Sequence, residues 1–297
     1  MPLRISDMQV SHEIDHRLLH THQFAMVDAL YREAWQGLAE HRVLAPSFLK
    51  SDTDRCPVLL DLRTVNPSTQ AYWLQTLHQQ AQEREPAGLS LLFQTESSID
   101  LVAAHCTARM VVKPTLEEPK QFRYFDPGTF LQLPRLLGEV GMAWLFWPFQ
   151  RITLAWAGEW IEYLVPQVDA VQRSEFALGL SHYEALSRLS IVNRAAFQCP
   201  APQSAQDWCQ RCERLEAAVR KGQQYGLTQR DDLVLFALHA ETQHPRFDEH
   251  PRIRQILQQL KSLPAEEELD YRELTQSFSP DDWKTLIDEL KTDKVSA

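Results

Sequence analysis

The hydrophobic pattern of the chain changes near Pro166, and this change sets the fold class. Before this residue, apolar side chains gather in short runs of strand length, bounded by Pro, Gly and polar turn residues. After it, they recur at intervals of three and four residues, which is the pattern of helices with one buried face. The sequence therefore predicts an α+β fold, in which a mixed α/β N-terminal domain with a central mixed sheet precedes an all-α C-terminal domain.

The same pattern divides the chain into four segments. Residues 1–21 are an N-terminal extension, and residues 22–165 are the α/β domain. Residues 166–263 are the helical domain, and residues 264–297 are a charged C-terminal tail with a short helix. A chain of 297 residues, 44% of them hydrophobic, is long enough for two domains of ordinary size.

The α/β domain is expected to alternate strands and helices. Strands are predicted at residues 23–30, 57–62, 89–95, 109–113, 122–125, 150–156 and 159–164, the last two joined as a hairpin at Ala157-Gly158. Helices are predicted at residues 31–41, 66–82 with Asn66 as cap, 99–106 with a serine cap, and 127–137. In the C-terminal half, helices are predicted at residues 181–197, 207–222, 231–241 and 253–263, and from Ser279-Pro280 onward.

The stretch from Phe122 to Pro127, Phe-Arg-Tyr-Phe-Asp-Pro, is the densest local signal in the chain. Its aromatic side chains favour a strand, while Pro127 keeps Asp126 out of the helical region and is well suited to the first turn of a helix. We therefore expect Asp126 to cap that helix. Arg123 and Asp126 are expected to form a structural ion pair or cap, with partner binding as the alternative.

Charge and composition exclude several classes of protein. The net charge of -10 and the pI of about 5.6 disfavour a nucleic-acid binder, which needs clustered Lys and Arg. No apolar run approaches the roughly 18 residues of a membrane span, and the N-terminus becomes polar before a secretory segment is complete. Five scattered cysteines favour reduced thiols over a disulfide framework. A cytoplasmic protein with protein partners is expected.

One pattern indicates a metal site. His12-Glu13-x-x-His16 matches the His-Glu-x-x-His pattern of zinc hydrolases, and His22 stands where one branch of these enzymes has a third ligand. Such a site needs a glycine at position 19, where this chain has Leu19. A solvated histidine cluster is therefore the preferred interpretation, and a zinc-dependent hydrolase stays as the alternative.

The remaining candidates for chemistry have simpler structural interpretations. Cys209-x-x-Cys212 lies in a helical pattern without a second pair and is expected to be two partly buried thiols. Ser181 lacks the turn of a hydrolase nucleophile and is expected to cap a helix. Asp28 and Asp61 follow two strands, where they form either a carboxylate pair or hydrogen-bonded strand ends. We therefore predict no catalytic residue, no metal and no cofactor, and the protein is expected not to be an enzyme.

Separate stretches of the chain carry a resemblance to one family. The residues concerned are Phe24 to Ala29, Trp73-Leu74, Phe122 to Pro127, Trp147-Pro148 and Trp160, with Tyr225-Gly226-Leu227, Phe236, Pro245, Phe247, Pro251 and Ile253 in the helical half. They resemble the adaptor proteins, or effector chaperones, of bacterial type VI secretion. The match covers residues 22 to 165, and Phe122 to Pro127 is its most specific part.

The resemblance implies a non-catalytic protein of the bacterial cytoplasm that binds a cognate toxic effector and promotes its loading onto the spike protein, with no nucleic acid and no membrane as partner. Exposed members of the group Trp144, Phe146, Trp147 and Phe149 are the candidate partner-binding residues, because aromatic side chains are common interface anchors. Their alternative place is the core. The family-motif residues expected to be structural are Asp28, Phe122, Arg123, Tyr124, Asp126 and Pro127. A toxin-neutralising immunity protein is a further alternative.

Overall fold

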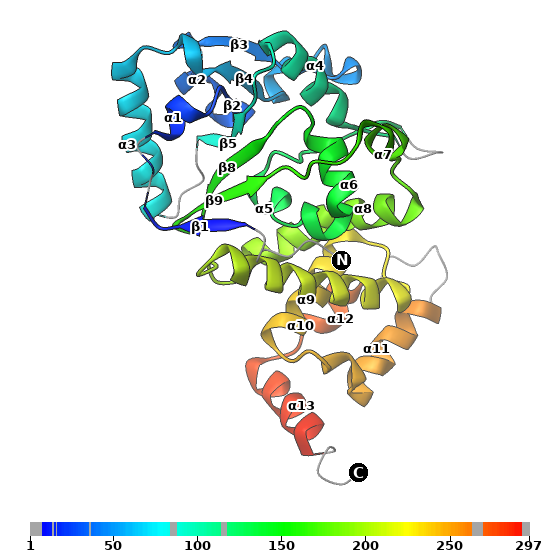
Figure 1. Cartoon of the computed structure of the whole chain (residues 1–297). Helices are drawn as coiled ribbons and strands as arrows, with labels where there is room; N and C mark the ends of the chain where they lie inside the picture. Colours follow the sequence, from blue (N-terminus) through cyan, green and yellow to red (C-terminus); the bar gives the residue numbers. More distant parts are fainter. Residues whose placement is uncertain are drawn as a thin grey trace. The chain divides into compact units, whose positions relative to one another are not determined.

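The computed structural model describes residues 8–13, 15, 17–35, 37–83, 88–113, 118–262 and 270–292. Contacts within the chain divide it into two units (Figure 1). Unit 1 comprises Met1–Tyr183 and Pro202–Gln206, and unit 2 comprises Glu184–Ala201 and Asp207–Ala297. The predicted boundary between residues 165 and 166 lies inside unit 1.

A seven-stranded sheet is the centre of unit 1, and its strands follow the order β1-β9-β8-β5-β2-β4-β3. The strands are β1 (Gln9–Ser11), β2 (Phe24–Val27), β3 (Glu40–Val43), β4 (Val58–Asp61), β5 (Leu89–Gln94), β8 (Arg151–Trp156) and β9 (Glu159–Leu164). All its strand pairs among the described residues are antiparallel, so the expectation of a mixed sheet is wrong in this respect. The α+β class itself is confirmed.

Local sequence explains the hairpin and the central strands. Ala157 and Gly158 both have positive φ, 52° and 81°, as a tight two-residue turn between twisted strands requires. Every residue of β2 and of β4 is buried, because layers of helices cover both faces of the sheet there. The sequences of these strands are therefore continuous apolar runs, without the alternation of apolar and polar residues that is typical of a strand with one solvent-exposed face.

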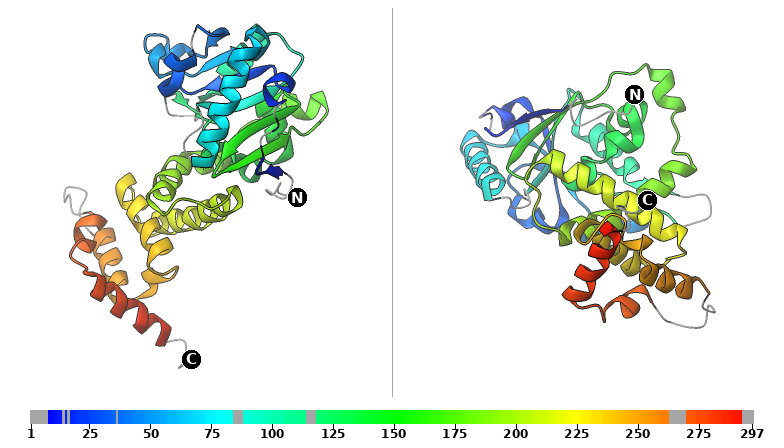
Figure 2. Two further views of the ribbon diagram at one scale, coloured as in Figure 1. Left: turned by 90° about the vertical axis from the view of Figure 1, so that its left-hand side faces the viewer. Right: turned by 90° about the horizontal axis from the view of Figure 1, so that it is seen from below.

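One face of the sheet is covered by α1 (Leu18–Thr21), α2 (Arg32–Trp35) and α3 (Pro67–Glu83), as the turned views show (Figure 2). The Asn66 side chain accepts a hydrogen bond from the Thr69 amide at 2.9 Å, which confirms the predicted cap of α3. Trp35 and Trp73 meet edge to face, with ring centroids 4.6 Å apart. This layer is aliphatic around that tryptophan pair.

The opposite face is covered by α4 (Ile99–Arg109), α5 (Pro127–Phe130) and α6 (Leu133–Phe146). Its core is aromatic: Phe93 stacks on Phe149 with centroids 4.2 Å apart, and Phe130 packs against both Phe146 and Tyr163. The short helix α7 (Ala170–Glu175) follows β9 and contacts α6. The two faces thus have different cores: tryptophans among aliphatic residues on one face, and mainly Phe and Tyr rings on the other.

Several predicted elements differ from the observed ones. The helix expected at 127–137 is two helices, and α6 itself bends at Gly138, where φ is 64° and ψ is -176°. The strand expected at 122–125 is a turn, and the strand expected at 109–113 shrinks to β6 (Val111–Val112), which pairs with β7 (Lys120–Gln121) in a separate small sheet. The helix expected at 31–41 is only a 3₁₀ turn (Ala29–Tyr31) and α2, followed by β3.

Unit 2 is helical. Its elements are α8 (Leu180–Gln198) and α9 (Ala205–Gln224), whose first residues belong to unit 1, then α10 (Arg230–Thr242), α11 (Pro251–Ser262), α12 (Tyr271–Thr275) and α13 (Pro280–Thr292). Gly226, with φ of 92°, ends α9 in the predicted glycine turn. An aromatic core joins α10, α12 and α13, in which Phe236 packs on Phe247 and Tyr271, and His239 packs on Trp283.

Among the described residues, none of the helices combines the length and the apolar character that a bilayer crossing requires.

Candidate functional site

Three family-motif residues meet in one ion-pair cluster at the end of β2. Arg123 donates through Nε and Nη2 to the two carboxylate oxygens of Asp126, at 3.0 and 2.9 Å, and Nη2 also donates to Asp28. Asp28 accepts in addition the Leu30 amide, at 2.9 Å, and so caps the 3₁₀ turn that follows β2. The predicted ion pair of Arg123 and Asp126 is confirmed, and Asp28 belongs to it.

Asp126 does not act as a helix cap. It occupies the N-cap position of α5, but its carboxylate forms no cap hydrogen bond and binds Arg123 instead. Burial raises the pKa of Asp126, and the Arg123 guanidinium offsets part of that rise. Burial lowers the pKa of Arg123, but the neighbouring Asp126 and Asp28 carboxylates outweigh it and leave this pKa raised. The guanidinium is thus the group that allows two carboxylates to lie together.

Asp61 is not part of this cluster. Because β2 and β4 are antiparallel, Asp61 pairs in register with Phe24, at the opposite end of β2 from Asp28. Asp61 instead accepts hydrogen bonds from Arg63, including one at 2.6 Å from its Nη2. The two aspartates are therefore separate strand-end groups, as the simpler interpretation of the sequence held.

The aromatic residues of the motif are buried scaffold. Tyr124 and Phe125 have almost no exposed surface, and Phe122 is 8% exposed. The Tyr124 hydroxyl donates to the Cys106 carbonyl at 3.3 Å, and burial raises its pKa well above the ordinary value. Pro127 begins α5 in its first turn, as predicted. The motif therefore anchors the turn that leads into α5.

The four candidate partner-binding aromatics separate into two pairs. Phe146 and Phe149 are buried in the aromatic core and are not available to a partner. Trp147 is 41% exposed, and Trp144 is half-buried. The peptide between Trp147 and Pro148 is cis. Only the two tryptophans can therefore belong to a surface that another protein contacts.

Cationic side chains that the sequence did not single out surround these tryptophans. The Arg109 guanidinium lies 3.9 Å from the Trp144 ring centroid, and that of Arg173 lies 5.1 Å from the Trp147 ring centroid. Trp144, Trp147, Arg109 and Arg173 are called the Trp–Arg surface below. Helical spacing could have indicated Arg109, because it lies one turn after His105 on the same face of α4. The predicted helix ended at Cys106, so the two residues were not placed together.

His105 connects the parts of the Trp–Arg surface. Its ring meets that of Trp147 edge to face at 5.7 Å, and its Nε2 donates to the Leu145 carbonyl at 2.9 Å. Burial, together with the smaller effect of the positive charges of Arg109 and Arg173, lowers the pKa of His105 to about 4, so the ring is neutral at pH 7. Both guanidinium groups therefore lie within electrostatic reach of one imidazole.

The zinc pattern loses its third ligand. His22 is buried, its Nδ1 lies 2.8 Å from the Leu18 carbonyl oxygen, and its Nε2 lies 3.0 Å from the Thr153 hydroxyl. Both ring nitrogens are engaged in hydrogen bonds, so neither is free to bind a metal ion. His16 lies outside the described residues, among which no three His, Cys, Asp or Glu side chains form a metal-binding group.

The other sequence candidates are structural. Cys209 and Cys212 are buried thiols within α9. Ser181 lies inside the first turn of α8, which begins at Leu180, so its predicted role as a cap is wrong.

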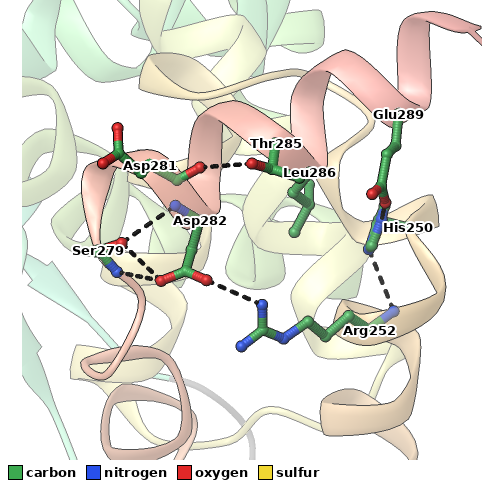
Figure 3. A pocket seen from close by; sticks show the side chains of 8 residues that line it. All are labelled: His250, Arg252, Ser279, Asp281, Asp282, Thr285, Leu286 and Glu289. Atoms are coloured by element: carbon green, nitrogen blue, oxygen red, sulfur yellow. Dashed lines mark hydrogen bonds and ion pairs between the residues drawn. The ribbon is translucent and has the colours of Figure 1, made fainter.

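A pocket of about 290 Å³ lies in unit 2, between the start of α11 and α13 (Figure 3). Two pairs of its polar side chains are in contact: Arg252 lies 3.3 Å from Asp282, and His250 Nε2 lies 2.7 Å from Glu289 Oε2. Ser279 exchanges hydrogen bonds with Asp282 and forms a capping box at the start of α13. This network fixes the start of α13, which the sequence predicted.

No family model, curated protein or solved structure matches the chain. The geometry of its own residues is therefore the basis for a functional proposal.

The ion-pair cluster gives a prediction about the relative cost of removing its cation and one of its carboxylates. Arg123→Met is expected to lower the free energy of unfolding by about 2 kcal/mol, because it leaves two carboxylates together without a cation, in a partly exposed site. Asp126→Asn should cost less than about 1 kcal/mol, since Arg123 keeps its ion pair with Asp28 and the amide oxygen of the substituted residue can still accept a hydrogen bond from Arg123. Urea unfolding of both variants measures the two losses of stability. An equal loss in the two variants would contradict the expectation that Arg123→Met costs more.

Proposed function

We propose that this protein is a non-catalytic adaptor, an effector chaperone of bacterial type VI secretion, which binds a cognate toxic effector in the cytoplasm and promotes its loading onto the spike protein. The proposal starts from the resemblance carried by Phe24 to Ala29 and by Phe122 to Pro127. Its partners would be the effector and the spike protein, with no nucleic acid and no membrane.

The observation that supports this proposal best is the contact between Arg123 and Asp28. These residues belong to the two separate stretches of the resemblance and lie 95 positions apart in the sequence. Arg123 nevertheless joins them in one cluster at the end of β2, and its guanidinium lies 5.0 Å from the centroid of the Phe125 ring. A chance similarity of short stretches has no reason to unite them, whereas a shared scaffold does.

The direct test is capture of partners from the source bacterium. The full chain, tagged at its C-terminus and expressed at its native level, is expected to capture a secreted toxin and the spike protein, both identified by mass spectrometry. Deletion of the gene should abolish delivery of that toxin to target cells. Recovery of neither protein, including after co-expression with the neighbouring genes, would contradict the proposal.

The deletion strain also distinguishes an adaptor from an immunity protein. A strain without an adaptor should grow normally among its siblings and lose only the ability to intoxicate competitors. A strain without an immunity protein should instead be killed by its own toxin. Growth in co-culture with the parent strain, with the gene restored on a plasmid as control, therefore decides between the two functions.

A further inference from the structure

The Trp–Arg surface contains the guanidinium groups of Arg109 and Arg173. Among the described residues, no carboxylate forms an ion pair with Arg109 or Arg173. Each guanidinium instead lies against a tryptophan ring, within the distance at which a cation is attracted to the ring face. The chain has 40 acidic residues and 30 basic ones, so two arginines on one surface that pair with no described carboxylate need an explanation.

Arg109 carries an additional unsatisfied group. Its Nε is buried and has no hydrogen-bond partner among the described residues, and burial lowers the pKa of this guanidinium. A buried donor without an acceptor is costly, and such groups in native proteins call for a specific reason. A carboxylate of another molecule beside Nη1 or Nη2 of Arg109 would stabilise this partly buried positive charge, although Nε itself stays out of its reach.

The surface is held in place by close packing between α6 and α7. Phe176, at the end of α7, packs on Trp144 with ring centroids 5.4 Å apart. Gly141 of α6 makes this approach possible, because a Cβ at this position would lie only 2.8 Å from the Phe176 ring. The two arginines are restrained further by the rings on which they lie. Binding would therefore order few side chains that are mobile in the unbound protein.

We propose that the Trp–Arg surface is a docking site for an acidic segment of a partner protein, whose carboxylates bind Arg109 and Arg173 and whose apolar side chain packs on Trp147. An arginine stacked on a ring keeps the edges of its guanidinium open for a carboxylate, and Trp and Arg are the commonest anchors at protein interfaces. The proposal rests on the proposed function only in taking this partner to be the effector or the spike protein.

Charge distinguishes this partner from a nucleic acid. Arginine and tryptophan also suit a single-stranded nucleic acid, whose bases stack on aromatic rings. Such binding, however, needs a groove with many cations along the phosphate backbone. The Trp–Arg surface has two cations and belongs to a chain of net charge -10. A short acidic peptide segment needs no more than these two.

Binding of defined probes to the full chain tests the docking site. The main probe is a fluorescein-labelled peptide of Asp and Glu residues around a central Leu-Phe pair, and fluorescence anisotropy measures its affinity. We expect saturable binding that weakens as salt increases. A peptide with Lys in place of the acids, and one with Gly in place of the Leu-Phe pair, are expected to bind at least tenfold more weakly. Tighter binding of a single-stranded oligonucleotide than of the acidic peptide would overturn the proposal.

Matched variants locate the binding. R109Q/R173Q is expected to weaken binding of the acidic peptide by about tenfold or more, because charge-assisted hydrogen bonds to both arginines are lost. If the double variant does not fold, Arg173→Gln alone is the second variant, because Arg173 lies on a short surface helix. This single substitution should also weaken binding of the acidic peptide. R17Q/R55Q removes the same charge from two exposed arginines of unit 1 that already pair with Asp15 and Asp52, and should leave affinity unchanged. Unchanged affinity in R173Q, or an equal loss in R17Q/R55Q, would refute the site.

The same variants separate this inference from the proposed function. If the full chain captures toxin and spike protein from the source bacterium, Arg173→Gln should reduce capture of at least one of them. Undiminished capture of both would overturn the docking site and leave the adaptor function intact. Conversely, if no toxin is captured while the peptide results are as expected, the adaptor function falls and the acidic-segment site stands.

Discussion

Phe146→Ala is expected to lower the free energy of unfolding of unit 1 by about 3 to 5 kcal/mol, the usual cost of truncating a fully buried aromatic side chain. Phe146 has no exposed surface and packs edge to face on Phe130 and Tyr124, with centroids 5.3 and 5.5 Å away. The cavity would lie between α6 and the sheet, where close packing limits its collapse. Urea unfolding followed by circular dichroism measures the loss.

Trp147→Ala is the matched control, because it truncates the next residue of the same segment. Trp147 is 41% exposed, and its contacts with Arg173 and His105 lie at the surface. We expect a loss of about 1 kcal/mol from these contacts, together with weaker binding of the acidic peptide. A Trp147→Ala variant as unstable as Phe146→Ala would show that both aromatics are core and that no binding surface exists here.

Elements with strong local signals could be predicted from the sequence. The helix after Asn66 combines a cap with Pro67 in its first turn, and the hairpin at Ala157-Gly158 has a turn that only certain residues adopt. The start of α13 at Ser279-Pro280 is a third such case. In each, residues within a few positions of one another fix the backbone, so no knowledge of tertiary contacts is needed.

Elements that depend on distant partners could not be predicted. β3 is a polar edge strand, Glu-His-Arg-Val, and is a strand because it pairs with β4. The motif aromatics Phe122 to Phe125 have strand propensity, yet the buried contacts of Tyr124 and Phe125 hold them in a turn. The antiparallel direction of the sheet, which separates Asp28 from Asp61, is likewise a property of the whole topology.

The candidate site was predictable only in part, for the same reason. Trp144 and Trp147 stand out in the sequence, but so do Phe146 and Phe149, and burial alone distinguishes the two pairs. Arg173 lies 26 positions after Trp147 and reaches it because α7 returns to α6 after the hairpin. Helical periodicity identifies neighbours on one helix, whereas this surface is assembled from three.

Lowering the pH from 7 to 5 is expected to destabilise both units, because three histidines, one buried and two partly buried, must stay neutral in the folded protein. Burial lowers the pKa of His22, His105 and His239 to about 4 each, from an ordinary value of 6.5. The unfolded chain therefore takes up protons in this range while the folded chain does not, so the stability present above pH 6.5 is lost as the pH falls toward 4. For each histidine, the difference in pKa between the folded and unfolded states lowers the free energy of unfolding by about 2 kcal/mol between pH 7 and pH 5.

Variants that keep a hydrogen-bond donor of the neutral imidazole, but cannot take up a proton, should reduce this pH dependence. In His105→Gln, the amide nitrogen can replace Nε2 as donor to the Leu145 carbonyl, and in His22→Asn it can replace Nδ1 as donor to the Leu18 carbonyl. Whatever each substitution costs at pH 7, the difference in unfolding free energy between pH 7 and pH 5 should shrink by about 2 kcal/mol in either variant. Urea titrations at both pH values measure it.

Exposed histidines provide the control for this experiment. His20 is exposed on α1, so His20→Gln should leave the difference between the two pH values as in the parent chain. The raised pKa of Asp126 changes stability in the opposite direction, because its carboxyl takes up a proton in the folded state first. A variant His105→Gln with the full parental pH dependence would contradict this prediction, because it would mean that His105 takes up a proton as readily in the folded protein as in the unfolded chain, although Arg109 and Arg173 lie beside it.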